Sequence, residues 1–266
     1  IMSSTPESSS VAAPDRVADL ERLAQSLNLT SLTRDQLKSL LDQSEQQGIS
    51  YSDFATRLLE AEIRTRRDRK LTRILKRSRL DRELDTLDSF DFTKRPKLRA
   101  ASVRELLDCR WITEARNIIC VGRPGLGKTR ILKALGRAAC EKGFDALYVV
   151  TAKMLEDLQA SLADGTYRRV LRRYERPSVL LCDEFGYEPF DARATNFLFR
   201  LISARHRKAP TVLATNTGFS SWRSIFPSEA QAVATVDRLI DNASILNFTG
   251  KSWRAPKDGS LDNPDD

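Results

Sequence analysis

The 266-residue chain has little of the chemistry that metal and membrane sites require. It contains one histidine, His206, and four cysteines, Cys109, Cys120, Cys140 and Cys182, which stand far apart. Zinc sites bring Cys and His together at short spacing, so we expect no structural metal and buried, reduced thiols. No uninterrupted apolar run approaches the roughly 20 residues of a membrane-spanning helix, and the Ser-rich start lacks the apolar core of a signal peptide. We therefore expect a cytoplasmic protein that does not bind membranes.

Positive charge is in excess, with 44 Lys and Arg against 36 Asp and Glu, a formal charge of +8 that favours an anionic partner. The stretch 64–82 has ten basic and two acidic residues, an excess equal to that of the whole chain. A helix of this charge density can neutralise several DNA phosphates, although a solvated helix face has the same pattern. The predicted DNA contacts of this stretch are Arg64, Arg66, Arg67, Arg69, Lys70, Arg73, Lys76 and Arg77.

A second basic cluster precedes an apolar run near residue 178 and has helical spacing. Its members are Arg168, Arg169, Arg172 and Arg173, followed by Arg176. In an oligomer they could face DNA or the acidic groups of a neighbouring subunit, and the sequence supports both interpretations. Because the chain has no zinc finger or other base-reading motif, we expect backbone contacts and DNA deformation rather than sequence readout.

The chain divides into a helical first part and an α/β second part. Apolar residues recur at helical spacing from Val17 to Ile63 and predict an all-helical module, whose third helix continues through the basic stretch and ends near Ser89. From Asn117 short apolar runs alternate with helical segments, which is typical of a parallel sheet with crossover helices. The predicted domains are a disordered leader 1–14, a helical DNA-binding domain 15–92, an α/β domain 93–254 and a flexible tail 255–266.

Five strands and five helices are expected in the second part. The predicted strands are 117–121, 146–150, 178–182, 211–215 and 244–248. Helices should begin near Lys128, Thr151 and Ala192, with others at 167–174 and 230–240. This order predicts an α/β fold with a central parallel sheet.

The segment 122–129, Gly-Arg-Pro-Gly-Leu-Gly-Lys-Thr, matches the P-loop pattern and stands between an apolar strand and a helix. Glycines let backbone N–H groups surround phosphate, Lys128 would reach the β- and γ-phosphates, and Thr129 would bind Mg²⁺. Both flanks disfavour a glycine-rich turn that matches by chance. The predicted nucleotide contacts are Gly122, Pro124, Gly125, Leu126, Gly127, Lys128, Thr129 and Arg130.

Polar groups follow two other apolar runs. Asp183 and Glu184 end a buried strand, where Asp183 would hold Mg²⁺ and Glu184 would polarise the attacking water. Asn216 ends another strand and is either a γ-phosphate sensor or a turn residue. Arg238 and Arg254 could each be an arginine that acts on the phosphate of a neighbouring subunit, but without a family argument a solvated or salt-bridged side chain is the simpler interpretation.

In that order, these groups resemble the Walker A, Walker B, sensor 1, arginine-finger and sensor 2 set of AAA+ ATPases. More narrowly, the segments 183–189 (Asp-Glu-Phe-Gly-Tyr-Glu-Pro), 219–222 (Phe-Ser-Ser-Trp), 237–240 (Asp-Arg-Leu-Ile) and 252–254 (Ser-Trp-Arg) resemble IstB-like ATPases. These are transposition helper proteins of a bacterial insertion-sequence family, related to DnaC-type helicase loaders. The resemblance covers about residues 17–254 and departs from the family pattern at Thr217-Gly218 and Trp253.

The resemblance implies an ATPase that uses ATP and Mg²⁺, oligomerises on target duplex DNA, bends it and stimulates a partner transposase. It assigns sensor 1 to Asn216, the arginine finger to Arg238 and sensor 2 to Arg254. The main alternative is a DnaC-like loader whose N-terminal module grips a replicative helicase. A third is a nucleotide-switched scaffold that hardly hydrolyses ATP. Glu184 disfavours the scaffold, and the basic helix favours the transposition protein over the loader.

Overall fold

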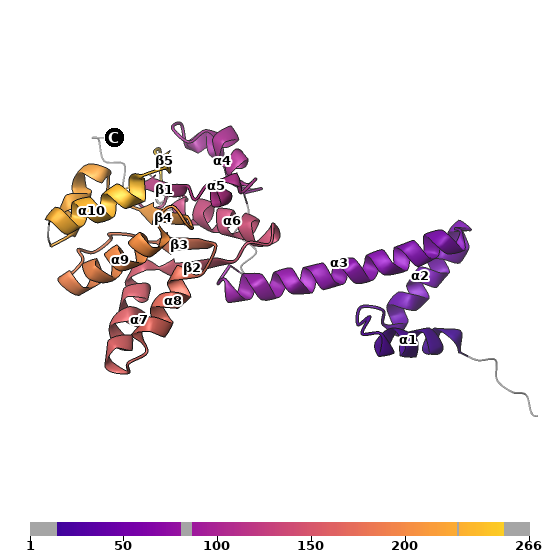
Figure 1. The fold of residues 1–266 in the computed structure, drawn as a ribbon. Helices are drawn as coiled ribbons and strands as arrows, with labels where there is room; N and C mark the ends of the chain where they lie inside the picture. Colours follow the sequence, from indigo (N-terminus) through magenta and orange to yellow (C-terminus); the bar gives the residue numbers. More distant parts are fainter. Residues whose placement is uncertain (1–14, 81–86, 228, 253–266) are drawn as a thin grey trace, which may run out of the picture. The chain divides into compact units, whose positions relative to one another are not determined.

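The computed structural model describes residues 15–80, 87–227 and 229–252. The chain forms two compact units, which divide between Lys70 and Leu71 (Figure 1). The predicted domain boundary at residue 92 falls after this division, because the segment that follows Lys70 packs in the core of the second unit. The predicted leader and tail, and Arg254, lie outside the described residues.

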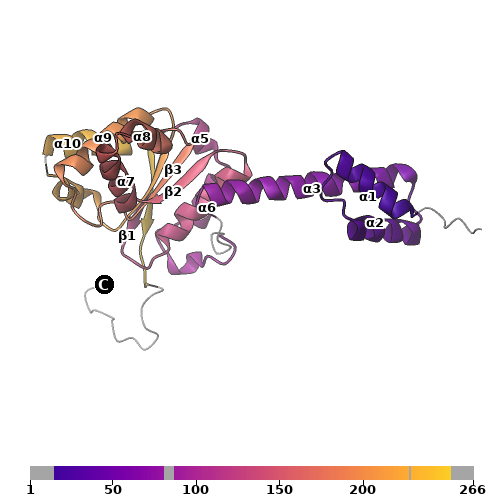
Figure 2. The same ribbon diagram turned by 90° about the horizontal axis from the view of Figure 1, so that it is seen from below.

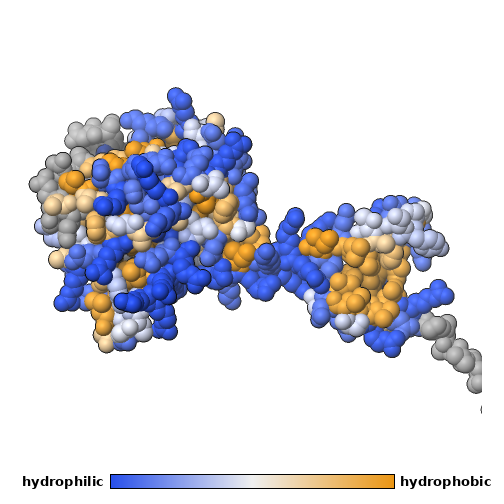
Figure 3. Space-filling view, in the orientation of Figure 1, coloured by the Kyte–Doolittle hydropathy of each residue, from blue (hydrophilic) through white to orange (hydrophobic). Residues whose placement is uncertain are grey.

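The first unit contains α1 (Arg16–Ser26), α2 (Arg34–Gln47) and the beginning of α3 (Tyr51–Arg77), as the apolar periodicity predicted. The Asp15 carboxylate accepts a hydrogen bond from the Ala18 N–H and caps α1, and Gly48 ends α2 in the left-handed conformation. A small core of Ala24, Leu32 and Leu37 holds the unit together. On its surface, hydrophobic side chains gather beside a strongly hydrophilic stretch of α3 (Figure 3).

The basic helix α3 ends at Arg77, so the predicted continuation to about Ser89 is wrong. Arg79 adopts the left-handed conformation with φ 60°, and the Leu80 N–H donates to the Leu75 carbonyl at 2.8 Å. Both leucines are buried in the second unit's core. Burial of Leu80 offsets the cost of roughly 1–2 kcal/mol for a left-handed arginine, so tertiary packing ends the helix where no glycine marks the end.

The second unit is a parallel five-stranded sheet in the order β2-β3-β4-β1-β5. Its strands are β1 (Asn117–Gly122), β2 (Ala146–Val150), β3 (Val179–Asp183), β4 (Thr211–Thr215) and β5 (Ala243–Phe248). Each lies within one residue of its predicted limits. The crossover helices are α6 (Lys128–Glu141), α7 (Thr151–Ala163), α8 (Tyr167–Glu175), α9 (Ala192–Arg205) and α10 (Glu229–Ile240). Short helices, η1 (Phe92–Lys94), α4 (Ala100–Leu106) and α5 (Arg110–Thr113), precede the sheet, and η2 (Phe219–Ile225) follows β4.

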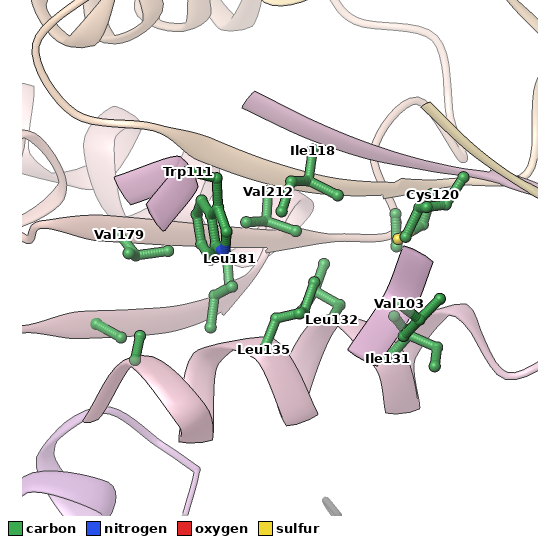
Figure 4. Packing of buried hydrophobic residues seen from close by; sticks show 14 of the residues in the cluster. Val103, Trp111, Ile118, Cys120, Ile131, Leu132, Leu135, Val179, Leu181 and Val212 are labelled. Atoms are coloured by element: carbon green, nitrogen blue, oxygen red, sulfur yellow. The ribbon is translucent and has the colours of Figure 1, made fainter. Parts of the chain in front are cut away.

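Helices cover both faces of the sheet, with α6 on one side and α7 to α10 on the other (Figure 2). Alternate strand residues face opposite sides, so Ile118 and Leu181 pack against Leu132 and Leu135 of α6 (Figure 4). Trp111 is buried in the same cluster. The four cysteines are buried free thiols. None of the described helices combines the length and hydrophobicity needed to cross a bilayer.

Candidate nucleotide-binding and DNA-binding sites

The P-loop connects the end of β1 to the first residue of α6. Gly125 and Gly127 have φ angles of 76° and 93°, a conformation that glycine adopts without steric cost. A Cβ at Gly122 would lie 2.3 Å from the Phe248 carbonyl oxygen, so the neighbouring strand β5 also requires glycine there. Because α6 begins at Lys128, its first N–H groups and the positive end of its dipole face the loop. This backbone geometry suits a phosphate group.

The Lys128 ammonium is held inside the loop. Its Nζ donates to the carbonyl oxygens of Gly122 at 2.6 Å and Arg123 at 2.7 Å, and the residue is only 7% exposed. These contacts keep the cation beside the N-terminus of α6, where an anion would bind. Thr129, the next residue, exposes its side chain to solvent.

Two arginines beside the P-loop, Arg130 and Arg95, have different environments. Arg130, a predicted nucleotide contact, donates to the carbonyl and hydroxyl oxygens of Ser89, and its guanidinium lies 5.9 Å from the centre of the Phe90 ring. Arg95 is buried, and its Nε donates to the Leu126 carbonyl at 2.8 Å. Arg95 therefore fixes the backbone of the P-loop at Leu126, a role that no sequence pattern predicted.

Asp183 is the last residue of β3 and is 5% exposed. Its Oδ1 accepts from the Glu184 N–H at 3.0 Å, and its Oδ2 accepts from the Tyr148 hydroxyl at 2.9 Å. The Thr151 hydroxyl donates to the Asp183 backbone carbonyl at 2.7 Å. The carboxylate is thus fixed by two donors, one of which, Tyr148, sequence reasoning did not identify.

Glu184 follows Asp183 with an exposed side chain and a left-handed backbone, φ 54°. The next N–H, of Phe185, donates to the Ala214 carbonyl of β4 at 2.9 Å and fixes the turn. A left-handed non-glycine residue costs of order 1–3 kcal/mol, and such residues concentrate at functional sites. The same turn contributes Glu184 to a groove of about 620 Å³ between α7 and the start of α9.

Asn216 comes directly after β4, which lies between β1 and β3 in the sheet. Neighbouring strands are about 4.8 Å apart, so the ends of β1 and β3 are roughly 10 Å apart with Asn216 between them. The structure therefore brings the P-loop, Asp183, Glu184 and Asn216 to one edge of the sheet. This edge has backbone N–H groups and an ammonium that can contact phosphates, and hydroxyl and carboxylate oxygens that can bind Mg²⁺. The set fits a nucleoside triphosphate with Mg²⁺.

Arg238 lies near the N-terminal end of β1, whereas the P-loop follows its C-terminal end. The side-chain amide of Asn117, the first residue of β1, donates to the Leu239 carbonyl at 3.0 Å. Six strand residues span about 20 Å, further than an arginine side chain reaches. The Arg238 guanidinium lies 4.9 Å from the centre of the Phe199 ring and donates to the Ala234 carbonyl at 2.7 Å. The structure therefore does not bring Arg238 to the chain's own P-loop.

His206 belongs to a cluster of hydrogen-bonded side chains beside Arg238. Its Nε2 lies 2.8 Å from Asp241 Oδ2, and the Arg207 Nε donates to the same oxygen at 3.0 Å. The pKa of Asp241 is lowered by its hydrogen bonds from Arg207 and His206. This cluster connects the ends of α9 and α10.

Several predicted DNA contacts on α3 also have partners within the protein. Arg66 donates from Nε to Glu62 at 2.6 Å and from Nη2 to the Asn28 carbonyl, and Arg69 donates to Thr30. Arg77 pairs with Asp145 at 2.6 Å in the second unit. These three predicted DNA contacts are therefore engaged within the protein. The other predicted contacts on this helix are Arg64, Arg67, Lys70, Arg73 and Lys76, and all eight side chains are exposed.

Helix α8 presents its predicted basic cluster to solvent. The exposed members are Arg168, Arg169, Arg172 and Arg173, whereas Tyr174 is buried and donates to Asp157 at 2.8 Å. The helix is held from behind by Arg205, a buried residue that donates to the carbonyl oxygens of Glu175 and Pro177, both at 2.9 Å. Burial lowers the pKa of Arg205 to about 10. Arg205 therefore fixes the end of α8, although the sequence marks it only as one more arginine.

The sequence matches the family model described as "IstB-like ATP binding protein" over residues 22–259. Among relatives, the ATP-binding protein of insertion sequence IS5376 from Geobacillus stearothermophilus is 35% identical over 77% of this chain and 82% of its own length. The ATP-binding protein of insertion sequence IS21 from Pseudomonas aeruginosa is 32% identical over 89% of this chain and 88% of its own length.

Solved structures with the same fold include two replication proteins. The DnaC helicase loader covers 62% of this chain and 97% of its own, with TM-score 0.50 and 18% identity. DnaA from Aquifex aeolicus bound to AMPPCP covers 63% and 50%, with TM-score 0.53 and 19% identity. The predicted AAA+ fold and P-loop ATPase class are thus confirmed. The chain belongs to the family of IstB-like ATP-binding proteins.

Proposed function

We propose that this protein is a Mg²⁺-dependent ATPase of DNA transposition that oligomerises on target duplex DNA, bends it and stimulates a partner transposase. The observation that carries the proposal is the convergence of the P-loop, Asp183, Glu184 and Asn216 at one sheet edge in a chain whose relatives are insertion-sequence ATP-binding proteins.

The nucleotide would bind with its phosphates at the N-terminus of α6. Lys128 exchanges its contacts with the Gly122 and Arg123 carbonyls for the β- and γ-phosphates, and glycine backbone N–H groups complete the cradle. Thr129 and Asp183 would hold Mg²⁺, which neutralises phosphate charge. Arg130, which contacts Ser89, would also contact the nucleotide. Arg254 is assigned to the same nucleotide by the family resemblance alone.

Hydrolysis requires a group that polarises water near the γ-phosphate. The exposed Glu184 carboxylate follows the Asp183 that would hold Mg²⁺, and the left-handed turn directs the chain away from β3 at this point. Asn216 lies between Asp183 and the P-loop and would contact the γ-phosphate or the water. We assign the general base to Glu184 and the sensor to Asn216.

Arg238 would act in a neighbouring subunit. It is about one strand length from its own P-loop, so its guanidinium can complete a nucleotide site only after assembly. An arginine supplied in this way stabilises charge on the transferring phosphoryl group. Hydrolysis would then depend on the oligomer, and the oligomer would depend on DNA.

For DNA, we assign the contacts on α3 to the exposed side chains of Arg64, Arg67, Lys70 and Lys76. Arg66, Arg69 and Arg77 support the helix from within the protein. The exposed arginines of α8 provide a second basic surface for DNA or for a neighbouring subunit. Binding of this kind is salt-dependent and largely sequence-independent.

The helicase-loader alternative rests on the fold that the chain shares with DnaC at 18% identity, whereas the insertion-sequence relatives are above 30% identical. We therefore favour transposition. A nucleotide-switched scaffold would not need a carboxylate at residue 184.

Negative-stain microscopy of the protein with duplex DNA tests the proposal. ATP should produce rings or short spirals, Glu184→Gln should retain them by blocking turnover, and Lys128→Ala should prevent them by removing the phosphate contact. Only monomers in the presence of ATP and DNA, for wild type and Glu184→Gln alike, would contradict assembly on DNA. Wild-type rates of phosphate release by Glu184→Gln would remove Glu184 from the mechanism.

A further inference from the structure

We propose that Tyr148 is a positioning residue, which holds Asp183 in the orientation required for Mg²⁺. The inference rests on the proposed nucleotide site and adds a residue to it. Tyr148 lies in β2, outside the P-loop and the segment 183–184. Its hydroxyl donates to Asp183 Oδ2 at 2.9 Å.

The sheet register brings the two side chains together. In the parallel β2–β3 pair, Tyr148 lies opposite Leu181 and Val150 lies opposite Asp183. Leu181 and Asp183 are two residues apart, so their side chains project from the same face of the sheet, the face covered by α6. The long tyrosine side chain spans the two-residue offset to the carboxylate.

Tyr148 is itself held on two sides. The Lys133 ammonium of α6 lies 4.7 Å from the centre of its ring. Its backbone N–H, on the edge strand of the sheet, donates to the Ser78 carbonyl at 3.0 Å, just beyond the end of α3. The hydroxyl therefore projects from a ring and a backbone that both have fixed contacts.

The two hydrogen bonds on Asp183 divide its oxygens between two donors. The Glu184 N–H takes Oδ1 at 3.0 Å and the Tyr148 hydroxyl takes Oδ2 at 2.9 Å. Donors on both oxygens fix the plane of a carboxylate, which one donor leaves free to rotate. Losing a hydrogen-bond partner of a metal-binding group typically lowers metal affinity about 10–100-fold.

Tyr148→Phe tests this role because it removes only the hydroxyl. The measurement is the affinity for a fluorescent ATP analogue, first in EDTA and then over a Mg²⁺ titration. We expect affinity in EDTA to change by less than about twofold and the Mg²⁺ midpoint to rise about tenfold. An unchanged Mg²⁺ midpoint would overturn the inference.

Tyr174→Phe is the matched control, since the Tyr174 hydroxyl donates to Asp157 at 2.8 Å, a bond of the same kind that does not touch Asp183. Its Mg²⁺ midpoint should equal that of wild type, and an equal rise in both variants would identify a general loss of stability and overturn the inference. If Tyr148 acts through Asp183, adding Tyr148→Phe to Asp183→Asn should have little further effect. Fully additive effects would contradict that route.

Failure of the proposed function gives a different result. If wild-type affinity did not respond to Mg²⁺ and Lys128→Ala left it unchanged, the nucleotide site itself would be refuted, and the Tyr148 inference with it. A normal wild-type Mg²⁺ response with an unaltered Tyr148→Phe response refutes the inference alone.

Discussion

Replacing Arg64, Arg67 and Lys70 together by alanine should weaken DNA binding and leave nucleotide binding unchanged. All three side chains are exposed, and alanine preserves the helix, so the substitutions should change stability by less than about 1 kcal/mol. Arg66 is left in place because it donates to the buried Glu62, and its loss would disturb the unit. The variant thus separates DNA contact from folding.

The expected size follows from counterion release. Log affinity falls with log salt at a negative slope, and each lost contact between a basic side chain and a phosphate reduces the magnitude of that slope by about 0.9, so three contacts reduce it by about 2.7. At about 0.1 M salt this corresponds to roughly a 10²- to 10³-fold loss of affinity.

The assay is fluorescence anisotropy of a labelled duplex over a series of salt concentrations. A matched control replaces Arg22, Arg34 and Arg57 by alanine, which removes the same charge from the same unit outside the basic stretch. Arg22 and Arg34 are paired with Asp19 and Asp15, so their loss should leave the slope near that of wild type. Equal slopes for the two variants would show that net charge alone matters and would refute the assignment of α3.

Three further outcomes follow from individual contacts. Arg238→Ala should retain ATP binding but lower the rate of phosphate release about 10³-fold or more. Mixing Arg238→Ala with Lys128→Ala subunits should restore part of the ATPase activity, because each variant keeps the residue that the other lacks. A mixture that stays inactive would exclude action of Arg238 on a neighbouring subunit. Burial tends to raise the pKa of Glu62, but hydrogen bonds from Ser31 and Arg66 outweigh burial and lower the pKa below 4.5. The stabilisation that the Glu62 carboxylate gives to the fold is therefore present above about pH 4.5 and is lost as pH falls. Circular dichroism should show that Glu62→Gln is less stable than wild type at pH 7 and less sensitive to acid, and equal acid sensitivity of the two proteins would count against this role. Arg205→Met should lower the Tm clearly more than Arg207→Met, because it leaves buried carbonyls without donors, and equal shifts would contradict that role.

The sheet and the phosphate loop could be predicted because their signals are local. Five apolar runs of strand length defined the strands to within one residue, and the pattern 122–129 carries its own backbone requirements. The positions of Asp183 and Asn216 at one edge then follow from the parallel topology. Each step uses only residues close in sequence and the rule that parallel strands end at the same edge.

The contacts that could not be predicted join residues distant in sequence. The end of α3 depends on burial of Leu80 in the core of the second unit, and the helical pattern alone continues past it. Tyr148 reaches Asp183 only through the register of β2 and β3, and no local pattern encodes that register. Arg66 likewise has two partners, Glu62 and the Asn28 carbonyl, and these come together only when α3 packs on the loop before α2.

A count of positive charge overstates the surface that DNA can use, because arginines differ in the groups that already contact their guanidinium: protein acceptors for some, and water for others. Arg205 is surrounded by carbonyl oxygens, and taking it to a phosphate would leave those acceptors buried and unsatisfied at a cost of about 1–3 kcal/mol each. Arg66 would have to give up the buried Glu62 carboxylate, which is similarly costly. Arg64 and Arg67 exchange mainly water for phosphate, with a gain from released counterions. The basic residues that bind DNA should therefore be exposed ones that need not give up a buried acceptor, and the length of the charge run in the sequence is a poor measure of their number.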